Sequence, residues 1–120
     1  MTLRERAQRL SDLMNNGQIM DALEEFYHDD VVLTEATGEQ FSGKDTQRQR
    51  ILDWMSGVEE LHGSGTSAIT VDEAAGVAML ETWTDATFRQ GGRFRFEEVQ
   101  VQRWEDGLIV SERFYYNMPG

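Results

Sequence analysis

The chain has no cysteine, a single proline and no long hydrophobic run in its 120 residues. Without cysteine it forms no disulfide and offers neither a thiolate nucleophile nor a thiolate metal ligand. No stretch approaches the roughly 18 apolar residues that cross a bilayer. Residues 1–7 (MTLRERA) also lack the apolar run of a secretory signal. We therefore expect a cytoplasmic protein with no membrane partner.

Basic residues are scarce as well, since 11 of them stand against 22 acidic residues and the net charge is -11. An acidic surface repels phosphate backbones and anionic lipids, so we expect no nucleic-acid partner. Histidine is limited to His28 and His62. Residues 28–30 (HDD) look like a metal cluster, but three adjacent side chains rarely converge on one ion. We expect no metal site and no cofactor.

The length is typical of one domain with its own core, so residues 1–120 are expected to form a single domain. Apolar residues recur at helical spacing in the segments 3–14, 19–27 and 43–58. The first helix is expected to stop at residues 15–17 (NNG) and the second at residues 28–30. Residues 42–45 (SGKD) resemble a capping box that opens the third helix.

Strands are predicted where β-branched and aromatic residues alternate, at 31–34, 67–71, 77–88, 93–104 and 108–117. Residues 35–40 break the first strand, and the glycine-containing turns at 89–92 and 105–107 join the last three. Helices gathered on one side of long antiparallel strands give an α+β fold. Because long strands curl, we predict a cone-shaped sheet wrapped around the three helices, with an open pocket.

Three motifs carry a family resemblance: residues 26–32 (FYHDDVV) leading to Glu35, residues 41–45 (FSGKD), and residues 104–109 (WEDGLI) followed by 113–116 (RFYY). Their order and spacing resemble the nuclear-transport-factor-two-like superfamily, in its SnoaL-like polyketide cyclase and ketosteroid isomerase branch. The resemblance extends over nearly the whole chain. It implies a cystatin-like α+β cone. It does not single out one function, because this fold hosts isomerases, cyclases, hydrolases, dehydratases and non-catalytic modules.

The resemblance places Glu35 where isomerase relatives hold their general base. A carboxylate partly enclosed by apolar side chains is a stronger base than one in water, which fits that role; the alternative is a solvated turn residue beside Glu39. Isomerase relatives add a tyrosine from the first helix and a protonated acid from a central strand. Leu10 and Gln100 occupy those positions here, so we expect little or no ketosteroid isomerisation.

Alternation along residues 93–104 separates two faces of one strand. If Gln100 faces the pocket as in relatives, then Phe96, Glu98 and Gln102 face it too, and their polar groups would orient a ligand. The alternative puts Val99 and Val101 in the core instead. We favour the pocket arrangement, because valines on the outer face would then suit a homodimer interface.

The last strand places Glu112, Phe114 and Tyr116 on one face. The resemblance implies an acid near Phe114 in hydrolase and cyclase relatives, and Glu112 or Glu98 would have to replace it. Glu112 would otherwise pair with an arginine across the sheet. Trp54 and Trp83 would stack on a flat ligand, although large aromatics are more often core. Tyr27 and Tyr116 would donate hydrogen bonds or pack in the core.

The sequence therefore predicts a protein that binds a small, largely hydrophobic molecule in a cone-shaped pocket. The first hypothesis is a cofactor-independent isomerase, cyclase or lyase with Glu35 as general base. The second is a non-catalytic ligand-binding or dimerising module. The expected pocket residues share one feature, a predicted position on the inner side of the cone: Leu10, Trp54, Phe96, Glu98, Gln100, Gln102, Glu112, Phe114 and Tyr116.

Overall fold

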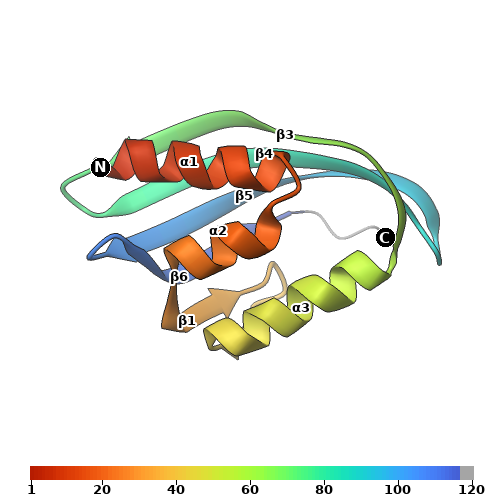
Figure 1. Ribbon diagram of the computed structural model, residues 1–120, viewed down its shortest axis with the longest axis horizontal. Helices are drawn as coiled ribbons and strands as arrows, with labels where there is room; N and C mark the ends of the chain where they lie inside the picture. Colours follow the sequence, from red (N-terminus) through yellow and green to blue (C-terminus); the bar gives the residue numbers. More distant parts are fainter. Residues whose placement is uncertain (117–120) are drawn as a thin grey trace.

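A computed structural model describes residues 1–116, in which three helices cover one side of a curled six-stranded sheet (Figure 1). The elements, in chain order, are α1 (Leu3–Asn15), α2 (Ile19–Phe26), β1 (Tyr27–Thr34), β2 (Gln40–Ser42), α3 (Lys44–Ser56), β3 (Val58–Asp72), β4 (Val77–Phe88), β5 (Gly92–Glu105) and β6 (Leu108–Tyr115).

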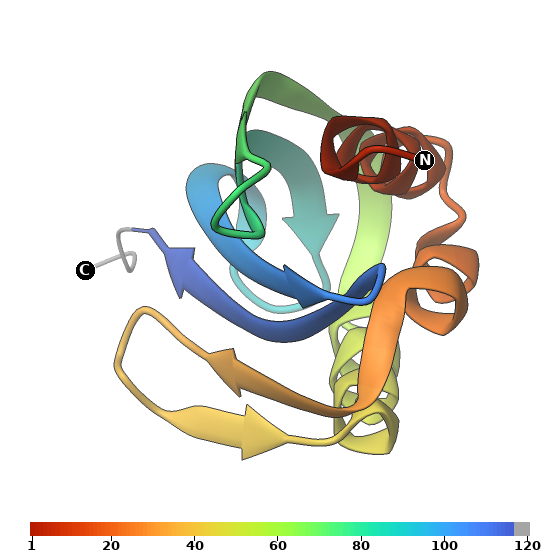
Figure 2. The same cartoon turned by 90° about the vertical axis from the view of Figure 1, so that its left-hand side faces the viewer.

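The strands follow the order β2-β1-β6-β5-β4-β3. All neighbours are antiparallel except β1 and β6, which run parallel. Seen from the end, the sheet curls without closing on itself, and the helices lie along its open side (Figure 2). The predicted α+β cone is confirmed, and the parallel β1–β6 pair is an addition that local sequence patterns do not reveal.

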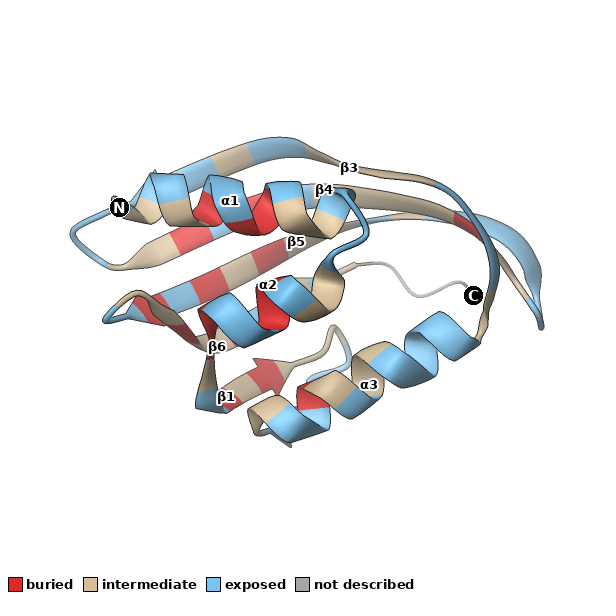
Figure 3. Cartoon of the chain, viewed as in Figure 1, coloured by how far each residue is buried: buried red, intermediate tan, exposed pale blue. Residues whose placement is uncertain are grey.

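The core lies between α1, α2 and the inner face of the sheet, where buried residues of both layers meet (Figure 3). Leu10 of α1, Phe26 of α2 and Trp104 of β5 belong to one apolar cluster, and the Phe26 and Trp104 rings meet edge to face at 5.7 Å. A capping box between Thr2 and Glu5 starts α1, with both hydrogen bonds at 3.1 Å.

The predicted boundaries of α2 and α3 need correction. Tyr27 pairs with Ile109 of β6, so α2 ends at Phe26 and residues 28–30 are strand rather than helix end. The capping box predicted at residues 42–45 is absent, because Gly43 is the N-cap of α3 and makes no side-chain bond there. Residues 40–42 form β2, whose three residues are too few to leave a periodic pattern.

The largest error concerns β3, predicted at 67–71 but extending over residues 58–72. Val58, expected on the third helix, begins this strand, because the helix ends at Ser56 and Gly57 is its C-cap. Gly63 and Gly65 lie in this strand beneath the Trp83 ring. A Cβ on Gly65 would stand 2.6 Å from the indole nitrogen. The glycines therefore make room for a tryptophan, which is a close-packing role for glycine within a strand.

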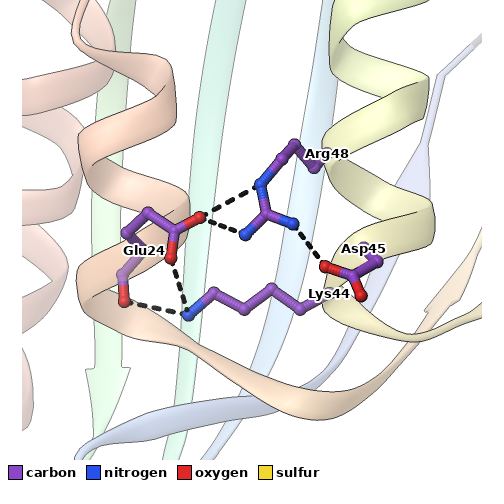
Figure 4. Close-up of polar contacts among 4 residues, drawn as sticks. All are labelled: Glu24, Lys44, Asp45 and Arg48. Atoms are coloured by element: carbon purple, nitrogen blue, oxygen red, sulfur yellow. Dashed lines mark hydrogen bonds and ion pairs between the residues drawn. The ribbon is translucent and has the colours of Figure 1, made fainter.

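Helix α3 has one buried residue, Gln47, and its Ile51 packs against the apolar core. Figure 4 shows Glu24 of α2 facing Lys44 and Arg48 of α3, and Arg48 also reaches Asp45. The Lys44 ammonium donates to the Glu24 carbonyl at 3.0 Å. These contacts hold α3 at the edge of the space that the sheet leaves open.

Among residues 1–116, no helix combines the length and apolar character that crossing a membrane requires. The last predicted strand, 108–117, ends at Tyr115 in the structure, and Asn117 lies outside the described residues.

Candidate functional site

A cavity of about 870 Å³ opens between α2, α3 and the inner face of β4, β5 and β6. Its outer part is aromatic, with Trp54 and Phe94 each 37% exposed. Its inner end is polar and buried, where Tyr27 is 7% and Glu112 2% exposed. The site thus combines an apolar entrance with ionisable groups that are shielded from water, the usual make-up of a small-molecule site.

Glu112 is the centre of the polar end. The Tyr27 hydroxyl donates to one carboxylate oxygen at 2.5 Å, and the Gln102 amide donates to the other at 2.8 Å. The Trp104 indole donates in turn to the Gln102 carbonyl oxygen at 3.2 Å. Each polar atom in this chain of side chains therefore has a partner.

Burial raises the pKa of Glu112 to about 7, although its two hydrogen bonds act in the opposite direction. The negative charges of Glu98 and Glu35 raise it further. Burial, followed by the charge of Glu112 and its hydrogen bond, raises the pKa of Tyr27 well above the usual value for a tyrosine. Glu112 therefore exchanges its proton near neutral pH, and Tyr27 remains a neutral hydroxyl.

Glu98 is the second carboxyl on the cavity wall. Gln100, itself 4% exposed, donates an amide hydrogen bond to Glu98 at 3.0 Å. Burial raises the pKa of Glu98, the Gln100 bond counteracts the rise, and the charge of Glu35 adds to it. The electrostatic influence of Glu35 on both Glu98 and Glu112 shows that the three carboxyls share one environment.

Glu35 follows β1 and opens a short turn, in which its backbone N–H donates to the Glu39 carbonyl at 2.9 Å. One carboxylate oxygen forms an ion pair with Arg50 of α3, and the other accepts a hydrogen bond from the Tyr116 hydroxyl at 2.8 Å. The Arg50 guanidinium lies 4.1 Å from the centre of the Phe41 ring. Glu35 is thus oriented from two sides at the cavity wall.

The structure brings most of the predicted site residues to this one cavity. Those that line it are Glu35, Trp54, Phe96, Glu98, Gln100, Glu112, Phe114 and Tyr116. Their position at the cavity does not establish what these residues do, so their function stays a prediction.

Two predicted pocket residues lie elsewhere. Leu10 has no exposed surface and packs in the apolar core. Gln102 points inward but is fully buried behind Glu112, which stands between it and the open space. Leu10 therefore belongs to the core, and Gln102 touches the site only through Glu112.

The alternative core assignments of the tryptophans are also wrong. Trp54 meets Phe88 edge to face at 6.2 Å at the cavity entrance. Trp83 lies over Gly63 and Gly65 with the Arg95 guanidinium 4.3 Å from its ring centre, outside the core cluster.

Arg50 is the functional-site residue that the sequence analysis missed. It stands beside Ile51 on a helix with a weak apolar face, so its position carried no periodic signal. Its partner, Glu35, is 15 residues earlier in another element. Only the fold relates the two.

Residues 1–116 contain no group of three histidine, aspartate or glutamate side chains arranged to hold an ion. Three of the carboxyls that line the cavity, those of Glu35, Glu98 and Glu112, are bonded to arginine, tyrosine and amide donors.

Comparison with known proteins relates this architecture to one family. Residues 1–116 match the family model for a SnoaL-like domain. A crystal structure of a candidate SnoaL-like polyketide cyclase from Mesorhizobium loti is 29% identical, with a TM-score of 0.87 over 97% of this chain and 100% of that one. No protein with a curated functional description matches the sequence.

More distant structures share the fold alone. A candidate isomerase from Bacillus subtilis is 17% identical, with a TM-score of 0.79 over 98% of this chain and 90% of the other. A candidate polyketide cyclase from Xanthomonas campestris is 16% identical, with a TM-score of 0.79 over 96% and 90%.

Proposed function

Since this chain belongs to the family of SnoaL-like domains, we propose that it is a cofactor-independent isomerase, cyclase or lyase. Its substrate is a small, largely hydrophobic carbonyl compound bound in the cavity. The observation that supports this most is the position of Glu112, a carboxyl with a pKa raised to about 7 at the buried end of a cavity whose outer part is aromatic. A group that exchanges a proton near neutral pH beside an apolar binding space is suited to proton transfer.

Glu35 is the proposed general base. Both of its oxygens have partners, Arg50 and Tyr116, but each oxygen keeps a lone pair that is able to accept a further proton. In the proposed step Glu35 takes a proton from the carbon beside the substrate carbonyl, and the electron pair moves onto the carbonyl oxygen as an enolate forms. Return of the proton from Glu35 to another carbon gives isomerisation. In cyclisation the enolate carbon instead bonds to a second carbonyl carbon, and the oxygen of that carbonyl takes the proton from Glu35.

The polar end of the cavity supplies the complementary donor. When Glu112 is protonated, its end of the cavity holds neutral O–H groups that stabilise charge developing on the enolate oxygen. Such stabilisation is strong where water is excluded, as at the 2% exposed Glu112. Glu35 and Glu112 thus take opposite roles in one cavity, as acceptor and donor.

A non-catalytic ligand-binding module is the second candidate. It is favoured by the same contacts on Glu35, because an ion pair and a hydrogen bond also suit a purely structural carboxylate. In that event the cavity binds the same class of hydrophobic molecule without changing it.

Exchange of the protons on the carbon beside a carbonyl distinguishes the enzyme from the non-catalytic module, and the natural substrate need not be known. Benzylacetone and β-tetralone would be incubated in deuterium oxide with the protein, and loss of their proton signals followed by NMR. We expect exchange above the buffer rate, reduced by about a hundredfold or more in Glu35→Gln because a positioned general base contributes that much.

Glu105→Gln is the matched control, because Glu105 is an exposed glutamate at the end of β5, away from the cavity. It removes the same charge and should exchange at the wild-type rate. Exchange at the buffer rate in the wild type, with both ketones bound, would favour the non-catalytic module.

We further propose a homodimer that forms through the outer face of the sheet. Met79 lies opposite Val101, and Val99 lies opposite Tyr115. These four apolar side chains lie on that face beside the charged Glu81 and Arg113, and Met79 is 44% and Tyr115 49% exposed. Sedimentation at micromolar concentration should give a dimer for the wild type and a monomer for Val101→Glu. A wild-type monomer would remove the proposal.

The cytoplasm is the proposed location. It rests on the absence of cysteine from the sequence. Cell fractionation with an antibody against the native protein would test it, and recovery outside the cytoplasmic fraction would contradict it.

A further inference from the structure

The chain Trp104–Gln102–Glu112–Tyr27 runs in one direction, and this direction has a chemical consequence. An indole N–H only donates, so the Gln102 amide must turn its oxygen toward Trp104. Its nitrogen is then left to face Glu112, to which it donates at 2.8 Å. The carboxyl oxygen of Glu112 beside Gln102 is therefore always an acceptor.

A proton that Glu112 takes up is consequently directed to its other oxygen. That oxygen is 2.5 Å from the Tyr27 hydroxyl, which donates to it when Glu112 is ionised. Once the oxygen carries a proton, it donates to Tyr27 instead. The Tyr27 hydroxyl hydrogen must then turn away, and Tyr27 lines the cavity.

We infer that Trp104 and Gln102 are positioning residues that make Tyr27 a hydrogen-bond donor to an uncharged oxygen of the bound molecule. Tyr27 donates in this way only while Glu112 is protonated. The inference rests on the proposed function. It requires a substrate with an oxygen that accepts hydrogen bonds, such as a carbonyl oxygen, placed at the inner end of the cavity. It also assigns tasks to Trp104 and Gln102, which do not reach the cavity themselves.

The groups that face Glu112 come from three parts of the fold. Tyr27 lies on β1 and Gln102 on β5, and both donate to Glu112. Glu98 on β5 and Glu35 after β1 contribute negative charge. Arg50, the cationic residue lining the cavity, is paired with Glu35. The change in the direction of the Tyr27 hydrogen bond, here called the switch, is therefore governed by the proton on Glu112 and not by a nearby cation.

The test uses benzylacetone as a probe and the stretching frequency of its carbonyl, which falls when the carbonyl accepts a hydrogen bond. In the wild type we expect a lower frequency at acidic pH and a higher one at alkaline pH, with the midpoint at the pKa of Glu112. Tyr27→Phe should give the higher frequency at every pH. A low carbonyl frequency that persists in Tyr27→Phe would overturn the inference. A carbonyl frequency that does not change with pH in the wild type would overturn it as well.

Trp104→Phe tests the positioning role. With the indole donor gone, the Gln102 amide is free to flip and accept the Glu112 proton on the opposite oxygen. This extra arrangement favours protonated Glu112, so its pKa should rise while the low carbonyl frequency weakens. Gln102→Met, which keeps the length of the side chain, is the second variant should Trp104→Phe fold poorly. Trp83→Phe is the control, because Trp83 packs over Gly63 and Gly65 and does not line the cavity, and it should change neither midpoint nor frequency.

Ligand-free NMR keeps this inference separate from the proposed function. The Tyr27 ring signals should shift with the same midpoint as Glu112 in the wild type, and that midpoint should move in Trp104→Phe. If benzylacetone does not bind but these shifts occur, the proposed substrate class fails and the switch stands. If the Tyr27 signals do not follow Glu112, the switch fails whether or not the ketone binds.

Discussion

The two ends of the cavity are built in opposite ways. At the inner end, Tyr27, Gln102 and Glu112 are buried and each polar group has a partner. At the entrance, Trp54 and Phe94 expose more than a third of their surface. Folding alone explains the inner end poorly, since burying a carboxyl is costly even when it is hydrogen-bonded. It explains the entrance poorly too, because exposed aromatics contribute little to stability. Both ends are therefore better explained by what the cavity binds.

The largest expected contrast comes from removing one tryptophan at each end. Trp104→Ala should lower the free energy of unfolding by about 3–5 kcal/mol, because it empties a buried site and leaves Gln102 without a donor. Trp54→Ala should cost about 1 kcal/mol or less, since its ring is already partly exposed. Urea unfolding of both variants measures the difference. Equal losses would mean that the entrance is part of the core.

The pH dependence of stability should differ at the inner end. The pKa of Glu112 lies at about 7 in the folded state and near 4.5 when unfolded, so the folded state binds the extra proton between these values. The contribution of Glu112 to the free energy of unfolding is therefore complete below about pH 4.5. It is lost as the pH rises to about 7, and the loss is on the order of 3 kcal/mol. The raised pKa of Glu98 acts in the same direction.

Glu112→Gln should remove most of this decline when urea unfolding is compared at about pH 5 and about pH 8. Glu105→Gln is the control, because it lowers the net negative charge equally and leaves the cavity unchanged. A wild type that is as stable at the higher pH, with no difference among the three proteins, would contradict a buried Glu112 of raised pKa.

A smaller effect is expected when the hydroxyl of Tyr27 alone is removed. Tyr27→Phe should cost about 1–3 kcal/mol, because the Glu112 carboxyl loses one of its two donors while remaining buried. The same change should raise the pKa of Glu112, since the lost bond favours the ionised form. Tyr115→Phe, on the exposed outer face, should change neither quantity in unfolding and NMR titration experiments.

The smallest effect is expected at the surface ion pairs that attach α3. Arg48→Gln breaks the contacts with Glu24 and Asp45, but these groups are well solvated and long side chains gain little there. The loss in unfolding free energy should lie near the experimental error and vanish in high salt. A large, salt-independent loss would show that the position of α3 depends on this network.

The sequence predicted the elements that have strong internal patterns. The hairpin of β4 and β5 was expected because alternation is long and two glycines mark its turn. The inner face of β5 followed from the same alternation. The early part of β3 was not predicted, because a glycine that makes room for a tryptophan within a strand cannot be told from a loop glycine by sequence. Gly63 and Gly65 are of the first kind.

The site was predictable only as far as strand faces allow. Alternation placed Glu98, Gln100 and Glu112 on inner faces, but no local pattern distinguishes a cavity wall from the layer behind it, where Gln102 lies. The contacts of Tyr27 with Glu112 and of Arg50 with Glu35 join residues of different elements. They depend on how β1, α3 and β6 meet, and therefore appear only in three dimensions.

The most direct test is an NMR titration of the glutamate carboxyls in the ligand-free protein. We predict that Glu112 titrates near pH 7, apart from the main group of glutamates, and that the Tyr27 ring signals move with it. Titration of Glu112 together with solvated glutamates, whose ordinary pKa is about 4.3, would contradict it. The inner end of the cavity would then be a solvated polar surface and not a site for proton transfer.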